Sequence, residues 1–273
     1  PLPVPTVGEQ ERIVEILEDQ LSRLNTALQS VRTVREKAAQ FRRSLLHAAF
    51  TGALTGHDVE EGELPEGWGS ATLRDLTANT RPICYGVLKP GDYVEAGVPL
   101  VRIVDIADDR LDLSAAHRIS DELDVEFSRS RISGGEVLLS IQGTIGRVAL
   151  APGSAAGANI SRTIALIQTD GRVPSPFVRY WLMWCSATNK FKIGGTTRNS
   201  LNIKDIRDLD CPLPSPEEQA RIVEILEDQL SRLDASLAAA DAVEERSEAL
   251  RRSLLHSAFT GRLTREWREA VNV

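Results

Sequence analysis

Cysteine, histidine and methionine are scarce in this chain, which limits the chemistry that it can carry. Its 273 residues include three cysteines, four histidines and one methionine. The cysteines, Cys84, Cys185 and Cys211, are odd in number and irregularly spaced, so neither a disulfide framework nor a zinc site is indicated. We therefore expect buried free thiols, a reducing cytoplasmic location and no bound metal.

Long apolar runs and catalytic signatures are absent as well. No run approaches the roughly 20 apolar residues that span a bilayer, and no charged-then-apolar signal segment opens the chain. The sequence has no Walker A loop, no HExxH helix and no GxSxG elbow. These absences predict a non-catalytic protein that has no membrane contact and no cofactor of its own.

Neither sign of charge dominates, because the formal net charge is only −7. The two signs are nevertheless segregated, since residues 105–126 are acidic whereas residues 127–168 and 190–207 are net basic. Such segregation lets one face meet phosphate while another face stays solvated. A solvated surface with random clustering of charge explains the same pattern almost as well.

What the chain does contain is a long internal repeat. Residues 9–55 and 218–264 align without gaps, and about 30 of the roughly 47 aligned positions are identical. A solenoid needs at least about three stacked units. Two widely separated copies instead indicate one type of helix that is used twice, side by side. Ser215 is the expected N-cap of the second copy.

Apolar residues in both copies recur at alternating steps of three and four, the period of a coiled-coil seam. The seam residues are Leu17, Leu21, Leu24 and Leu28 in the first copy and Leu226, Leu230, Leu233 and Leu237 in the second. After Val31 and Ala240 the apolar positions shift by an inserted step of three, which predicts a stammer in the supercoil. The shifted positions are Val34, Ala38, Phe41 and Leu45, and Val243, Ser247, Leu250 and Leu254.

The repeat also preserves polar residues that a seam does not require. The repeated charged residues are Glu15, Asp19 and Arg23 in the first copy and Glu224, Asp228 and Arg232 in the second. Packing against one partner helix does not dictate both faces of a helix, so these residues are candidates for binding the same partner protein twice. Recent duplication without any function would preserve them too, and two ordinary core helices are a further alternative.

Between the repeats, short apolar segments punctuated by Gly and Pro predict a compact mixed domain. Strands are expected at 99–104, 136–141, 147–150, 163–168 and 210–213, and helices at 177–188 and 203–209. The predicted fold class is α+β, with an antiparallel-rich β domain beside two long helices that form a coiled coil. The expected segments are a tail of an upstream domain (1–8), a first helical region (9–63), the mixed domain (64–213) and a second helical region (214–273).

Three motifs in this order suggest a family. Each repeat begins EQ-x-x-I-V, the mixed domain opens with LPEGW at residues 64–68, and GEVLLS-x-x-GTIG follows at residues 135–146. The chain resembles the specificity subunits of Type I restriction-modification systems, which alternate two target-recognition domains with two helical regions. It departs from that pattern because only one recognition domain is present.

The resemblance implies a DNA-recognition role without chemistry. The recognition domain would read one half of a bipartite target in double-stranded DNA, while the antiparallel helices would hold two methyltransferase subunits and, through them, the restriction motor subunit. S-adenosylmethionine is expected in the methyltransferase, not in this chain. A second copy of the chain could supply the missing domain by self-dimerisation.

Two glycine-led loops supply the candidate DNA contacts, because Arg and Asn pair with base edges and Thr suits phosphates. The DNA contacts predicted from these loops and the basic segments are Gln142, Thr144, Arg147, Arg162, Thr197, Arg198 and Asn199, with the division between bases and phosphates left open. Arg129, Arg131, Lys190 and Lys192 are the predicted phosphate contacts. The alternatives are a coiled-coil scaffold whose central domain binds protein, and an enzyme with its site in that domain.

Overall fold

The computed structural model describes residues 4–60, 62–107, 109–191 and 200–271. The chain divides into two compact units, one made of residues 1–42 and 228–273 and the other of residues 43–227. Two helices of 44 residues each, α1 (Val7–Phe50) and α5 (Pro216–Phe259), contribute to both units. The predicted N-cap is present, since the Ser215 hydroxyl accepts a hydrogen bond from the Glu218 amide at 3.2 Å.

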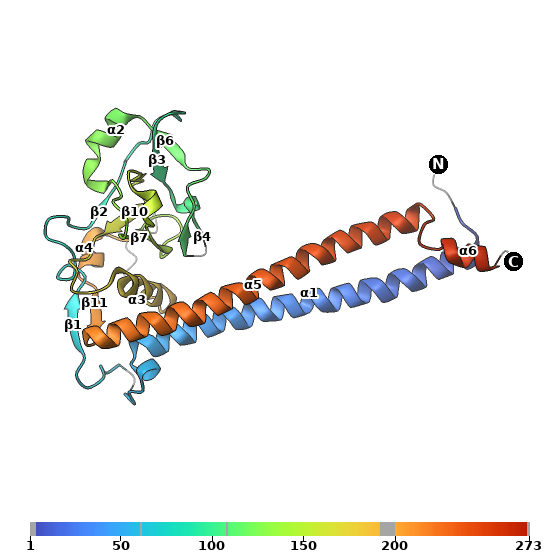
Figure 1. The fold of residues 1–273 in the computed structure, drawn as a ribbon, viewed down its shortest axis with the longest axis horizontal. Helices are drawn as coiled ribbons and strands as arrows, with labels where there is room; N and C mark the ends of the chain where they lie inside the picture. Colours follow the sequence, from blue (N-terminus) through green and yellow to red (C-terminus); the bar gives the residue numbers. More distant parts are fainter. Residues whose placement is uncertain (1–3, 61, 108, 192–199, 272–273) are drawn as a thin grey trace. The chain divides into compact units, whose positions relative to one another are not determined.

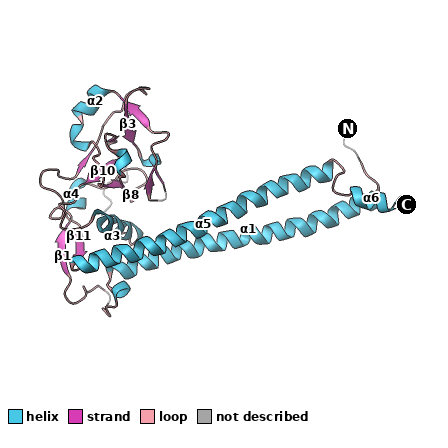
Figure 2. Ribbon diagram, viewed as in Figure 1, coloured by secondary structure: helices cyan, strands magenta, loops and turns pink. Residues whose placement is uncertain are grey.

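The first unit is an antiparallel helix pair (Figures 1 and 2). Arg35 on α1 forms ion pairs with Asp241 and Glu244 on α5, and Arg42 pairs with Asp234. The residue number of the partner on α5 therefore decreases as the residue number on α1 increases, so the two helices run antiparallel. A short helix, α6 (Arg265–Val271), follows α5.

The seam of this helix pair keeps one continuous register, so the predicted stammer is wrong. A shifted register would bury Val34, Phe41, Val243 and Leu250, but these side chains are 41–47% exposed. Ala38 and Ser247, one heptad beyond Val31 and Ala240, are instead 4% and 6% exposed. The seam position between them is filled by Arg35 on α1 and Glu244 on α5, which pair with each other. A charged layer thus replaces an apolar one without any change of period.

The second unit is built around a four-stranded sheet of order β2-β10-β7-β8. A three-stranded sheet, β6-β3-β9, and two strand pairs, β1-β11 and β4-β5, complete it. The pairing of β3 with β9 is parallel, and the other pairings between these strands are antiparallel. The bounds are β1 Gly69–Thr72, β2 Cys84–Tyr85, β3 Val98–Val101, β4 Ile106–Ala107, β5 Arg110–Leu111, β6 His117–Ile119, β7 Val137–Ser140, β8 Val148–Leu150, β9 Asn159–Ile160, β10 Ile164–Ile167 and β11 Asp210–Leu213.

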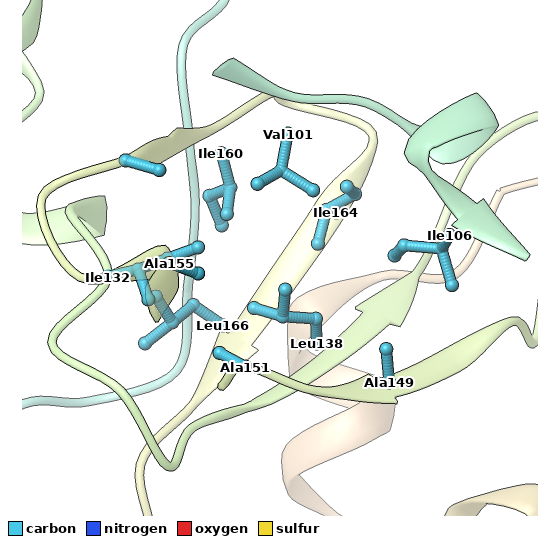
Figure 3. Close-up of a cluster of buried hydrophobic side chains, with 11 residues drawn as sticks. Val101, Ile106, Ile132, Leu138, Ala149, Ala151, Ala155, Ile160, Ile164 and Leu166 are labelled. Atoms are coloured by element: carbon cyan, nitrogen blue, oxygen red, sulfur yellow. The ribbon is translucent and has the colours of Figure 1, made fainter. Parts of the chain in front are cut away.

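Helices of the second unit flank these strands. They are α2 (Asp121–Glu126), α3 (Ser175–Ala187) and α4 (Ile203–Arg207), with 3-10 turns η1 (Ala53–Thr55), η2 (Ile103–Asp105), η3 (Ser128–Ser130) and η4 (Gly153–Ala155). One face of the four-stranded sheet packs against α3, and an aliphatic cluster that includes Leu138, Ile160, Ile164 and Leu166 is fully buried (Figure 3). This burial fixes the ends of β7 and β10, from which the candidate site projects.

The predicted α+β fold class is confirmed, with two long helices and antiparallel sheets. The strands expected at 136–141, 147–150, 163–168 and 210–213 form as β7, β8, β10 and β11, and the two expected helices form as α3 and α4. The strand expected at 99–104 ends earlier, because Ile103–Asp105 forms a 3-10 turn in which Asp105 accepts a hydrogen bond from the Arg102 amide at 2.7 Å. The predicted segment bounds remain predictions.

Candidate nucleic-acid interface

The loop between β7 and β8 is held in place by its own hydrogen bonds. The Ser140 hydroxyl donates to the Thr144 carbonyl at 2.6 Å and accepts from the Arg147 amide at 2.8 Å. Gly143 and Gly146 have φ values of 73° and 88°, a region that disfavours other residues. A Cβ at Gly146 would lie 2.1 Å from the Ser186 hydroxyl oxygen, so this loop requires glycine for its close approach to α3.

Four predicted DNA contacts meet at this end of the sheet. Gln142, Thr144 and Arg147 lie on the β7–β8 loop, and Arg162 lies just before β10, whose Ile164 pairs with Ser140. Thr144 and Arg162 are exposed and Gln142 is half-buried. Gln142 also forms an isolated bridge with Ser200, so the end of the second glycine-led loop adjoins the first.

Within this group, the Arg147 side chain also stabilises the fold. Its guanidinium donates to the carbonyls of Ile103 at 3.1 Å and Ile106 at 2.8 Å, so it ties η2 and β4 to the loop. A guanidinium has five N–H donors, so some remain for a ligand. A role of Arg147 in DNA binding remains a prediction.

Two predicted phosphate contacts lie at the opposite end of β7. Arg129 is on η3 and Arg131 follows it, before β7 begins at Val137. Arg131 pairs with Asp124, a carboxylate that is 7% exposed and also accepts from the Asn159 amide at 2.9 Å. Arg131 is therefore built into a buried polar network, whereas the Arg129 side chain is exposed.

Two further arginines, which the sequence did not single out, join Arg129 at this end. Arg81 donates to Glu136, a fully buried carboxylate, at 2.5 Å, and Arg207 at the end of α4 donates to the Ile83 carbonyl at 2.8 Å. They precede β2 and end α4, far apart in the sequence, and only the fold brings them together. Their basic character was the one available signal, and Arg207 lay in the segment already recognised as basic.

Lys190 belongs to neither group. Its ammonium lies 4.1 Å above the centre of the Trp184 ring on α3, a cation–π contact. It lines a hollow of about 980 Å³ together with Asp58, Glu60 and Asp210, which are acidic. Four other predicted contacts, Lys192, Thr197, Arg198 and Asn199, lie outside the described residues.

The repeated charged residues of the two helices are on the surface, in the same local arrangement. Arg23 Nε lies 3.1 Å from Asp19 Oδ1, and Arg232 Nε lies 3.0 Å from Asp228 Oδ1. The two arginine side chains are 73% and 74% exposed. Glu15 and Glu224, the remaining pair, are exposed as well. Partner binding by these residues remains a prediction, but their accessibility meets its first requirement.

A carboxylate at the start of α5 anchors the beginning of the mixed domain. Glu218, whose side chain is 19% exposed, accepts hydrogen bonds from the Thr55 hydroxyl at 2.6 Å, His57 Nε2 at 2.8 Å and Trp68 Nε1 at 3.1 Å. Glu9, its counterpart in the repeat, accepts from the hydroxyl of Thr264, the counterpart of Thr55, also at 2.6 Å. The duplicated sequence therefore makes the same contact twice, once in each unit.

Two kinds of site are not found in the part of the chain that the structure describes. No group of three or more His, Cys, Asp or Glu side chains there could hold a metal ion. No described helix is long and apolar enough to cross a membrane. The candidate site consists of the polar and basic side chains at the two ends of β7.

Comparison with known proteins gives a consistent result. The family model "Type I restriction modification DNA specificity domain" matches residues 65–239. The chain is 32% identical over 285 residues to the specificity subunit of the Type I restriction enzyme EcoBI from Escherichia coli, covering 98% of this chain and 59% of that protein. It is 27% identical to the putative specificity subunit MjaX from Methanocaldococcus jannaschii, over 62% of this chain and 41% of that protein.

Solved structures agree on the fold. A structure of a type I R-M system matches with a TM-score of 0.66 at 24% identity, covering 96% of this chain and 62% of that one. The HsdS subunit from Thermoanaerobacter tengcongensis matches with a TM-score of 0.52 at 21% identity, covering 96% and 60%. The chain thus spans about three fifths of the length of the EcoBI subunit and of these two solved chains.

Proposed function

The chain belongs to the family of Type I restriction-modification DNA specificity domains, and on this premise we propose that it is a non-catalytic DNA-recognition subunit. Its mixed domain reads one half of a bipartite target in double-stranded DNA. Its two helices hold methyltransferase subunits, one for each repeat, and through them the restriction subunit. The carrying observation is the family match over residues 65–239, which includes the whole mixed domain from Pro65 onward.

The position of the loop residues supports base reading. Gln142, Thr144 and Arg162 are gathered at one end of a sheet whose core is fully buried. Gln142 and Thr144 lie on a loop that hydrogen bonds and two glycines hold in place, and Arg162 lies just before β10. Amide and guanidinium groups form paired hydrogen bonds with adenine and guanine edges in the major groove. A rigid scaffold that presents such groups loses little conformational entropy on binding.

The repeated helix faces support binding of one kind of partner at two places. The Asp19–Arg23 and Asp228–Arg232 pairs have matching side-chain geometry and matching exposure. Exposed ion pairs contribute only about 0–1 kcal/mol to stability, so folding alone does not require both pairs. Two equivalent partner subunits would each meet one pair.

Co-purification with the methyltransferase encoded beside this gene tests both halves of the proposal. The complex is incubated with a random-sequence DNA pool, and the retained DNA is sequenced. We expect a stable complex that enriches a short motif, with a palindrome if two copies of the chain pair. No partner and no enriched motif would contradict the proposal and favour the protein-binding scaffold.

A charge reversal separates the two roles. The Asp19→Lys and Asp228→Lys double variant should lose most of the methyltransferase while retaining DNA binding. Glu11→Lys is the matched control, because Glu11 is exposed on the same helix and its counterpart in the repeat is an alanine. Equal methyltransferase binding by both variants would remove the repeated face from the proposal.

A further inference from the structure

The basic end of β7 is hollowed. A hollow of about 610 Å³ is lined by residues 80–84, by Ser128, Arg129, Arg131 and Ser133, and by Arg207. A second hollow of about 350 Å³ shares Pro82, Ile83 and Arg207 with it and continues to Arg74 and Asn79. We call the two together the arginine groove. It is assembled from three chain segments that the fold brings into one place.

The charged residues that line the arginine groove are all positive. Five arginines line it, namely Arg74, Arg81, Arg129, Arg131 and Arg207, and no described acidic residue does. Three of them are paired with carboxylates from outside the lining: Arg74 with Asp208, Arg81 with Glu136 and Arg131 with Asp124. The net positive charge therefore comes mainly from the other two.

Those two arginines have open donors. Among the described residues, the Arg129 guanidinium has no hydrogen-bond or ion-pair partner, and Arg207 makes only the bond from Nη2 to the Ile83 carbonyl. The positive charges of Arg129 and Arg207 both affect the pKa of the Cys84 thiol, which lines the same groove. Burial raises the pKa of this thiol, and the positive charges of Arg129, Arg81 and Arg207 oppose that rise. These three guanidiniums therefore act on one small volume.

We propose that the arginine groove binds a phosphodiester group of the DNA backbone, held by Arg129 and Arg207. A guanidinium presents N–H donors in a planar fork that matches phosphate oxygens. Ser128, Ser133 and Thr80 add hydroxyl donors to the lining, and such side chains commonly contact phosphates. The proposal rests on the proposed DNA-recognition function and locates part of it.

The groove and the glycine loop would then serve different ends. They lie at the two ends of β7, a strand of four residues that spans roughly 13 Å. Residues of the loop can specify bases, whereas contacts to phosphate position the protein without reading sequence. Substitutions in the two places should therefore differ in their dependence on salt and on sequence.

The test measures binding of a random-sequence duplex to the full chain by fluorescence anisotropy between 50 and 200 mM salt. Each phosphate contact contributes about −0.9 to the slope of log K against log salt. Because Arg129 and Arg207 hold the same phosphate, the double variant Arg129→Gln with Arg207→Gln should reduce the steepness by about one unit, which corresponds to a roughly 3.5-fold smaller loss of affinity over this range. Arg129→Gln alone should give part of that reduction, and Arg129→Lys should keep the slope. A melting curve verifies that the variants fold.

Arg221→Gln is the matched control, because Arg221 is exposed in the same unit and lines neither hollow. A slope for Arg129→Gln equal to that of the wild type and of this control would overturn the groove assignment while leaving DNA recognition intact. An absence of salt-dependent DNA binding by the wild type would contradict the proposed function itself. Loss of the methyltransferase with an unchanged DNA slope would assign the groove to a protein contact.

A calorimetric titration with inorganic phosphate, without DNA, tests whether the groove binds a free anion instead of a phosphodiester group of DNA. We expect no binding heat at millimolar phosphate, because two guanidiniums at the surface hold a single small anion weakly against water. Binding heat that Arg129→Gln abolishes, together with an unchanged DNA slope, would show that the groove holds free phosphate and would overturn the proposal.

Discussion

Replacement of Glu218 should loosen the attachment of the mixed domain to the start of α5. The Glu218 carboxylate accepts three hydrogen bonds, from Thr55, His57 and Trp68, and is only 19% exposed. A hydrogen bond to a charged group contributes about 1.5–3 kcal/mol, and a donor left without its acceptor loses that contribution. Because the three donors share one carboxylate and partly regain water, we expect Glu218→Ala to cost about 3 kcal/mol in total.

Unfolding in guanidinium chloride, followed by tryptophan fluorescence, measures this loss of unfolding free energy, since Trp68 is one of the donors. For a unit of this size a denaturant slope of about 5 kcal/mol per M is reasonable, so the midpoint should fall by about 0.6 M. Glu217→Ala is the control, because Glu217 shares the first turn of α5 but is exposed. A Glu218→Ala shift below about 0.2 M, or one matched by Glu217→Ala, would refute the reasoning.

The same carboxylate predicts a dependence on pH. Burial raises the pKa of Glu218, but hydrogen bonds from Thr55, His57 and Trp68 outweigh burial and lower this pKa below its ordinary value of 4.5. A group whose pKa is lowered on folding stabilises the fold above its ordinary pKa and loses that effect as the pH falls through the folded value. The advantage of the wild type over Glu218→Gln should be full at pH 7 and shrink below pH 4.5. A difference that stays constant to pH 3 would contradict this.

Two further predictions concern the repeat and the second glycine loop. Phe50 is 1% exposed and contacts the rings of Phe177 and Trp184, so Phe50→Ala should lower the free energy of unfolding by about 3–5 kcal/mol. Phe259, at the equivalent position of the second copy, is 65% exposed, and Phe259→Ala should cost almost nothing. Similar losses for the two variants in denaturant unfolding would contradict this. Arg198→Ala should weaken binding to the enriched motif much more than to random DNA, and equal loss on both in a competition assay would make Arg198 a phosphate contact instead.

Regular apolar patterns explain why much of the fold could be predicted. The repeat gave both long helices, and continuous apolar runs gave β7 and β10 because these strands are buried on both faces. The register of the seam beyond Val31 could not be predicted in the same way. Apolar residues at Val34 and Phe41 suggested a stammer, but the seam position belongs to Arg35, whose charge is met by Glu244 on the other helix. Periodicity alone does not show such cross-helix pairing.

The candidate site was predictable only in part, for a similar reason. The glycine loop is local in sequence, so its residues could be grouped from the sequence alone. Arg81 and Arg207 join Arg129 only because strands and helices from distant segments converge. Arg131 carries the right charge but is paired with Asp124, and composition cannot distinguish a guanidinium that is paired from one that has open donors.

The two copies of the repeat show that one sequence can serve several surroundings. Phe50 and Leu46 are buried in the second unit, whereas their counterparts Phe259 and Leu255 are 65% and 37% exposed. Packing within the second unit therefore explains the apolar end of the first copy but not that of the second copy. The exposed Asp19–Arg23 and Asp228–Arg232 pairs are alike in both copies, so packing within the chain does not account for them either. Charge reversal on these pairs, compared with the Phe50 and Phe259 variants, separates the surface proposed to bind a partner from the surface that stabilises the fold.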